Sequence, residues 1–220
     1  MDRDTDDVHQ ALTAPGQPPG RRALILLHGA AVAGQGEWVP WLGEQALAHG
    51  ESWERLEEAA LQVVAYGGFP RAIDTLDRLA GLRAGPARGS AVETRAEAQR
   101  LQDGRQVWET IYDRNAEQVL GTLESYSPGF SGWVLDAAYG RILSRGTLSL
   151  AERELLAVSA LGLAALPAPR GSHIRGALRS GSTAEAIHDT LTLSSLLADP
   201  RSLAVIDQAH DRLSRNVYRP

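Results

Sequence analysis

The sequence predicts an all-α protein, and three observations carry this prediction. Apolar residues recur every three or four positions, as in Leu56, Ala60 and Val63, which is the period of an amphipathic helix. Runs of β-branched residues and alternation of apolar and polar residues, which are typical of strands, are scarce. A helical pattern also occurs twice along the chain, which favours a fold built from two copies of one unit.

The internal repeat is degenerate but keeps its order and spacing. The motif Ala-Leu-x-x-Gly begins at Ala46 and again at Ala177, 131 residues later. In each copy the glycine stands where a helix C-cap belongs. A proline, Pro70 or Pro200, then breaks the chain ahead of the last helix of the copy. We therefore expect two tandem repeats that pack together as a pseudo-dimer.

The repeat divides the chain into four segments. Residues 1–20 are expected to be a flexible N-terminus, residues 21–82 the first, degenerate repeat, and residues 83–104 a polar and partly helical linker. The second repeat, with an additional helical lead-in, is expected over residues 105–220.

The helix that follows the second Ala-Leu-x-x-Gly motif has two candidate N-caps. Ser182, with Glu185 three residues later, fits a capping box, and Thr183 is the alternative cap. Either choice predicts a helix that begins near residue 184.

The composition excludes several classes of function. The chain has no cysteine, which rules out disulfides, thiolate metal sites and thiol peroxidase chemistry. It has no lysine either, so Schiff-base catalysis and a P-loop are excluded. A net charge of −5 predicts no nucleic-acid partner. The apolar runs are too short to cross a membrane and the acidic N-terminus does not resemble a signal peptide, so a cytoplasmic protein is expected.

The segment SHIRGALRSGSTAEAI, residues 172–187, resembles the signature H-x-R-x-A-L-x-x-G-x-T-x-E-E-I of the carboxymuconolactone decarboxylase (AhpD-like) superfamily. The stretch from Trp108 to Leu213 is similar to a complete unit of this family, and residues 21–82 resemble the same unit without its lead-in. The resemblance implies an AhpD-like helical fold whose units pair and assemble further. A homotrimer of the fused chain is therefore expected.

The resemblance also implies an active site around His173. His173 is expected to act as the acid and base, with Glu154 as its partner, because AhpD-like members place a proton-relay glutamate 19 residues before the histidine. Glu152 is the alternative partner. The substrate's carboxylate is expected to bind Arg170, which lies one turn before His173 on the same helix face, or Arg175, which matches the family's H-x-R.

The first copy lacks the corresponding residues. The positions that match His173 and Glu154 are Leu42 and Ala23, 131 residues earlier. We therefore expect the first copy to act as scaffold and pocket wall, with only the second copy bringing ionisable side chains into the site. His28 is expected in or near the core of a buried helix.

The function that the resemblance implies is a lyase acting on a small carboxylated lactone by general acid–base catalysis. When a γ-carboxylated butenolide loses CO2, the electron pair flows through the ring double bond to the lactone carbonyl. The substrate is its own electron sink, so neither cofactor nor metal is expected. The alternative is a catalytically degenerate member that serves in ligand binding or assembly.

Overall fold

A computed structural model describes residues 5–85 and 92–218, and these residues form helices and no strand. The predicted all-α class is confirmed. In chain order the helices are α1 (Thr5–Thr13), α2 (Pro19–Ala33), η1 (Gly36–Trp38), α3 (Val39–Ala48), α4 (Trp53–Leu79), η2 (Ala80–Leu82), α5 (Glu97–Tyr112), η3 (Asp113–Asn115), α6 (Ala116–Tyr126), α7 (Phe130–Val134), η4 (Leu135–Leu143), α8 (Leu150–Leu163), α9 (Pro167–Arg179), α10 (Ala184–Ser195) and α11 (Pro200–Ser214).

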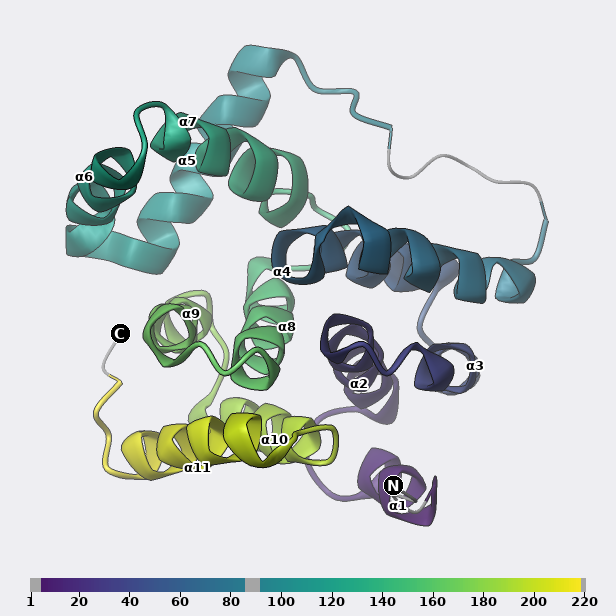
Figure 1. The fold of residues 1–220 in the computed structure, drawn as a ribbon. Coiled ribbons are helices and arrows are strands. Elements are labelled where there is room, and N and C mark those ends of the chain that lie inside the picture. Colours follow the sequence, from purple (N-terminus) through teal and green to yellow (C-terminus); the bar gives the residue numbers. More distant parts are fainter. Residues whose placement is uncertain (1–4, 86–91, 219–220) are drawn as a thin grey trace.

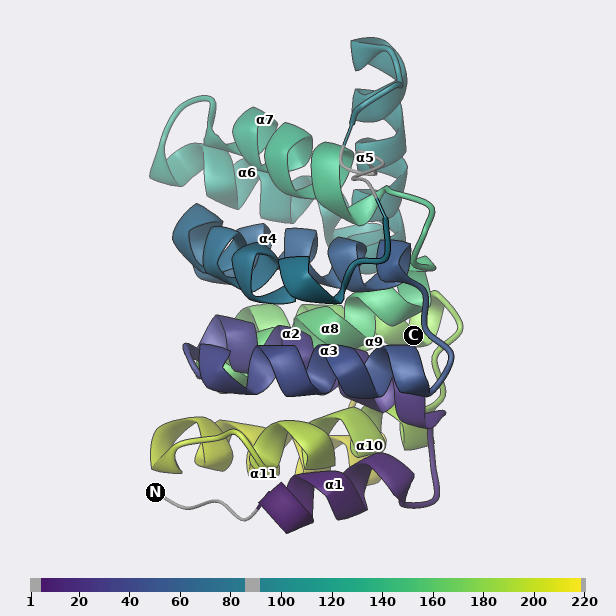
Figure 2. The same cartoon turned by 90° about the vertical axis from the view of Figure 1, so that its right-hand side faces the viewer.

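The helices are stacked in layers (Figures 1 and 2). Helices α2, α3, α8 and α9 form a middle layer, which α4 covers on one side and α1, α10 and α11 cover on the other. The apolar faces of these layers meet in one large core that includes Leu26, Leu42 and Val158. The lead-in helices α5 and α6, with η4, enclose a second, smaller core around Trp108.

Corresponding helices in the two copies end in the same backbone hydrogen bonds. A Schellman pair closes α3 around Gly50, and the same pair closes α9 around Gly181, 131 residues later. Both glycines have positive φ, 90° and 100°, which favours glycine at these positions. A matching pair of hydrogen bonds recurs around Gly34 after α2 and around Ala165 after α8, again 131 residues apart.

Two buried ion pairs cross between the copies in a reciprocal way. Arg22 of α2 binds Asp189 of α10, with Nε 3.1 Å from Oδ2. Arg153 of α8 binds Glu58 of α4, with Nη2 2.6 Å from Oε2. Arg153 follows Arg22, and Asp189 follows Glu58, by 131 residues. Such exchange is typical of a two-fold interface, and it supports our proposal that the copies pack as a pseudo-dimer.

The described N-terminal residues differ from the flexible segment predicted over residues 1–20. Residues 5–13 form α1, and Val8 and Leu12 on one face of it are almost fully buried. Two apolar residues four positions apart are a weak signal in an acidic segment. Burial against the rest of the fold, rather than helix propensity, holds this short helix in place.

Two further details refine the predicted boundaries. Thr183, not Ser182, caps α10, because the Thr183 side chain accepts a hydrogen bond from the Ala186 amide at 3.1 Å. In the predicted linker, residues 97–104 already belong to α5, whereas residues 86–91 lie outside the described residues.

Both predicted proline breaks are present. Pro200 begins α11 after the Asp199 cap. In the first copy the break lies at Gly68, two residues before Pro70, where φ is 78° and ψ is 171°. This backbone conformation is open almost only to glycine, and it divides α4 into two helical segments. The segment after the break begins with Phe69.

Candidate active site

A buried histidine–carboxylate pair joins the two central helices of the second copy. Glu154 lies on α8 and His173 on α9, and His173 Nδ1 is 3.1 Å from Glu154 Oε1 and 3.0 Å from Oε2. The side chain of Glu154 is fully buried and that of His173 is 6% exposed. A carboxylate is seldom buried without a partner, and His173 provides one here.

Gly176, one turn after His173, makes room for this carboxylate. A Cβ atom at Gly176 would come within 3.0 Å of Glu154 Oε2 and would also press on Ile111 of α5. Real Cβ atoms do not approach other atoms so closely. Glycine at position 176 therefore lets α8 and α9 come close enough for the pair to form.

The pair defines the roles of the two imidazole nitrogens. Because both carboxylate oxygens of Glu154 face Nδ1, the neutral ring of His173 is expected to carry its proton on Nδ1 and donate it to Glu154. The other nitrogen, Nε2, is then left with a lone pair that can accept a proton and return it. This arrangement suits general acid–base catalysis.

The first copy contributes Tyr66, which the sequence analysis did not single out. The ring of Tyr66, on α4, lies edge-on to His173 with 6.1 Å between ring centroids, and edge-on to His28 of α2 at 5.8 Å. Burial raises the pKa of Tyr66 well above its ordinary value, and the negative charge of Glu154 adds to this. The expectation that only the second copy brings ionisable side chains to the site is therefore wrong.

Two further phenols come from the lead-in helices. Tyr139 of η4 donates its hydroxyl hydrogen to the hydroxyl of Tyr112 of α5 at 3.1 Å, and both rings pack on Trp108. Burial raises the pKa of Tyr112, and it raises that of Tyr139 well above its ordinary value. These phenols, like Tyr66, stay protonated at neutral pH. They can donate hydrogen bonds but cannot act as bases.

Arg175 lines a polar pocket next to these tyrosines. The pocket has a volume of about 310 Å³, and Tyr112, Ser172 and Arg179 also line it. Arg175 is half-buried, and its only printed side-chain contact is a long one, 3.4 Å from Nη2 to the Ser172 hydroxyl oxygen. Arg179 is more firmly held, with Nη1 donating to the Ile111 carbonyl oxygen at 2.6 Å. Two guanidinium groups at one polar pocket can bind a carboxylate.

Arg170 and Glu152 lie elsewhere. Arg170 is fully buried but turns to α11, where its Nη1 donates to the carbonyl oxygen of Val205. Glu152 closes the capping box of α8 and binds Arg55 at 2.7 Å. Although burial opposes ionisation, hydrogen bonds, that from Arg55 foremost, lower the pKa of Glu152 to about 2. The structure thus does not bring either residue to His173.

The aromatic residues of the site carried no signal that a sequence pattern detects. Tyr66 has a leucine, Leu197, as its counterpart 131 residues later, so the repeat did not mark it. Its place beside His173 depends on how α4 packs over α2 and α9. Among the described residues, no group of three His, Cys, Asp or Glu side chains that could hold a metal ion is present. No described helix is long and apolar enough to span a membrane.

Comparison with known proteins agrees with the resemblance. Residues 128–211 match the family model described as "Carboxymuconolactone decarboxylase family". This stretch reaches from just before α7 into α11 and contains both Glu154 and His173. Residues 128–211 are therefore a domain of the carboxymuconolactone decarboxylase family. The chain is also 28% identical over 153 residues to "Peroxisomal protein 2" of Schizosaccharomyces pombe, a match that covers 68% of this chain and 72% of that protein.

Proposed function

We propose that this protein is a cofactor-free acid–base enzyme of the carboxymuconolactone decarboxylase type, which acts on a small carboxylated lactone. The observation that carries the proposal is the pair formed by His173 and Glu154, in which the carboxylate takes up Nδ1. The presence of a carboxymuconolactone decarboxylase family domain over the same residues adds support.

In the proposed reaction the bond between the ring and the substrate's carboxylate breaks and CO2 leaves. The electron pair of that bond moves through the ring double bond onto the lactone carbonyl oxygen. His173, protonated on both nitrogens and stabilised by Glu154, then gives the Nε2 proton to a ring carbon. The product is an enol-lactone, and the imidazole returns to its neutral form.

The surrounding residues suit the charges that this reaction creates. The developing enolate oxygen needs a hydrogen-bond donor, and Tyr66 is a phenol that stays protonated beside His173. A second carboxylate of the substrate needs a cation. Arg175 is the better of the two predicted anchors, because Arg170 turns away to α11.

The proposal is tested with γ-carboxymuconolactone as substrate, by following CO2 release and the loss of lactone absorbance. We expect turnover by the wild type, and a fall of about 100- to 10,000-fold in kcat for His173→Gln, the range that a positioned acid or base contributes. His49→Gln is the matched control, because His49 is exposed at the end of α3. Equal rates for His173→Gln and wild type would remove His173 from the mechanism.

One observation favours a second candidate, a member of the family that has kept the fold without the activity. The side chains of His173 and Glu154 are 6% and 0% exposed, as expected of a pair that serves only the core. Absence of turnover in the wild type, together with a clear loss of stability in His173→Gln, would support this binding or assembly function. The homotrimer expected from the resemblance is tested separately, by sedimentation equilibrium.

A further inference from the structure

A second candidate binding site lies away from His173, between α4 and the helices α7 and η4. A cavity of about 510 Å³ opens there, which is within the range of small-molecule sites. His173 and Glu154 are not among its lining residues. Its walls are mainly apolar and include Val64, Ala65, Phe69, Trp133, Val134 and Ala138.

The aromatic residues of this cavity are unusually exposed. Phe69 on α4 and Trp133 on α7 are each 69% exposed, and both line the same concave space. Single exposed apolar residues are common on protein surfaces, but large ones gathered around one cavity indicate a binding site. They provide the apolar surface that a ligand would cover.

Both walls are built from irregular backbone. On one side, the non-helical residue Gly68 precedes Phe69 and sets the direction in which α4 continues. On the other, Ala138, Arg141 and Ile142 belong to η4, which is a π-helix over Leu135–Leu143. π-Helical turns are rare and occur often at functional sites.

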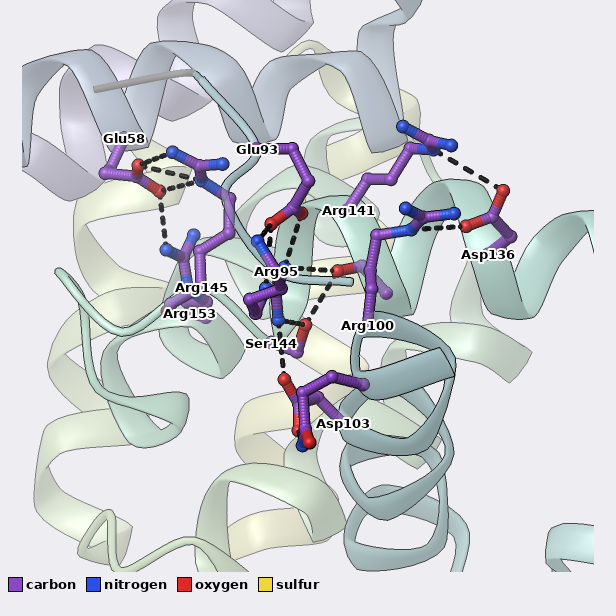
Figure 3. Close-up of polar contacts among 12 residues, drawn as sticks. Glu58, Glu93, Arg95, Arg100, Asp103, Asp136, Arg141, Ser144, Arg145 and Arg153 are labelled. Carbon is purple, nitrogen blue, oxygen red and sulfur yellow. Dashed lines mark hydrogen bonds and ion pairs between the residues drawn. The ribbon is translucent and has the colours of Figure 1, made fainter. Parts of the chain in front are cut away.

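Two of the three charged side chains at the cavity are already engaged (Figure 3). Glu93 is held by Arg95 at 2.8 Å, and Arg145 is held by Glu58 at 2.7 Å. The pKa of Glu93 is lowered to about 2, chiefly by its hydrogen bonds from Arg95. These two groups therefore contribute little net attraction for a ligand.

The third charged side chain, Arg141, is only weakly paired. Its Nε is 3.4 Å from Asp136 Oδ2, and Asp136 is bound more closely by Arg100 at 2.9 Å. The Arg141 side chain is 51% exposed. A cation with a distant and shared counter-ion, at the edge of an apolar cavity, is complementary to a ligand with an apolar body and one negative charge.

We propose that this cavity binds an amphipathic monocarboxylate, whose apolar chain covers Phe69 and Trp133 and whose carboxylate binds Arg141. The site is separate from the His173 pair, so the proposal does not depend on the reaction proposed above. The chain length of the natural ligand is set by the cavity, and decanoate is a suitable probe.

The test is a calorimetric titration of the full-length protein with decanoate and, as an uncharged counterpart, decanol, both kept below their aggregation limits. We expect saturable binding of decanoate at one site, with decanol at least about 10-fold weaker, as the loss of one charge-assisted hydrogen bond implies. Arg141→Gln is expected to weaken decanoate about 10-fold and to leave decanol unchanged. Arg201→Gln, an exposed arginine on α11, is the matched control and should bind as the wild type does.

A second set of variants tests the location. Ala137→Phe fills the cavity and is expected to abolish binding while the melting temperature stays within a few degrees of the wild type. Decanoate is also expected to quench Trp133, and this signal should be absent in Trp133→Phe. Ala137→Phe that binds normally would place the ligand elsewhere and overturn the proposal.

Three further outcomes would overturn it. One is the absence of saturable decanoate binding, and another is equal affinity for decanoate and decanol, which would remove the role of Arg141. The third is a wild-type oligomer that does not bind decanoate and that Phe69→Ser converts to monomers. In that case a second copy of the chain covers the cavity.

Discussion

Gly176 and the carboxylate of Glu154 occupy neighbouring space so tightly that a single methyl group on the glycine would displace the carboxylate. The glycine lies on the helix that carries His173, and Glu154 lies on the helix that faces it. The position of the His173–Glu154 pair therefore depends on a residue that has no side chain and takes no part in proton transfer.

The first prediction follows from this contact. Gly176→Ala forces Glu154 or Ile111 to move, and we expect it to lower the free energy of unfolding by about 1–3 kcal/mol, as overpacking in a core does. Gly121→Ala is the control, because Gly121 lies inside α6 with open space around it and alanine is favoured in a helix by about 0.5–1 kcal/mol. Urea denaturation measures both. An unchanged or raised stability of Gly176→Ala would contradict the close fit.

The second prediction concerns Tyr66. If its hydroxyl donates to the developing enolate oxygen, Tyr66→Phe should lower kcat by about 10- to 100-fold. Binding of the substrate should change little, because the phenyl ring that packs against His173 and His28 is kept. Steady-state kinetics with γ-carboxymuconolactone separate kcat from KM. A rise in KM with kcat unchanged would give Tyr66 a binding role instead.

The third prediction concerns the ion pair of Glu58 and Arg153, which are 1% and 0% exposed. Although burial opposes its ionisation, hydrogen bonds from Arg145 and Arg153 lower the pKa of Glu58. Glu58→Gln leaves Arg153 buried without its counter-charge and is expected to cost about 3–5 kcal/mol of stability.

A paired replacement is the control for this prediction. Glu58→Leu combined with Arg153→Met removes both charges and should be less destabilising than Glu58→Gln alone. A double-mutant cycle by chemical denaturation gives the comparison. Equal losses in the single and the paired variants would mean that the charge of Arg153 is not confined to the core.

The fourth prediction is a pH dependence due to His28. Burial lowers the pKa of His28 from 6.5 to about 4, with a smaller opposing effect of the Gln62 backbone. Between these values the unfolded chain binds a proton that the folded protein does not. The contribution of His28 to stability is thus fully present above pH 6.5 and is lost as the pH falls to about 4.

We therefore expect wild type to lose stability relative to His28→Met over this window, by at most about 1.4 kcal/mol per pH unit. Denaturant unfolding at several pH values measures the difference. The exposed His49→Gln variant should keep the pH dependence of the wild type. Parallel stability curves for wild type and His28→Met would show that His28 is protonated in the folded protein.

The features that sequence could predict are those set by local rules or by the family resemblance. The Schellman endings at Gly50 and Gly181 and the breaks near Pro70 and Pro200 depend on residues close together in the chain. The resemblance singled out His173 and Glu154, and the structure brings them into contact.

The features that sequence could not predict depend on packing between distant helices. Arg170 shares a helix face with His173, yet α11 supplies the carbonyl oxygen to which it donates. Glu152 was as plausible a partner as Glu154 until its role in the capping box and its contact with Arg55 were visible. Tyr66 reaches the site only because α4 lies across the middle layer.

The exchange of charged partners between the halves has a consequence for cutting the chain. Arg22 finds its acid in the later half, and Glu58 finds its arginines there. A fragment of either half, made alone, would hold charges whose counter-ions are on the missing piece, and would be a poor folding unit. Cleaved within the connection at residues 86–91, the two pieces should instead remain associated, with each acting as the template for the other.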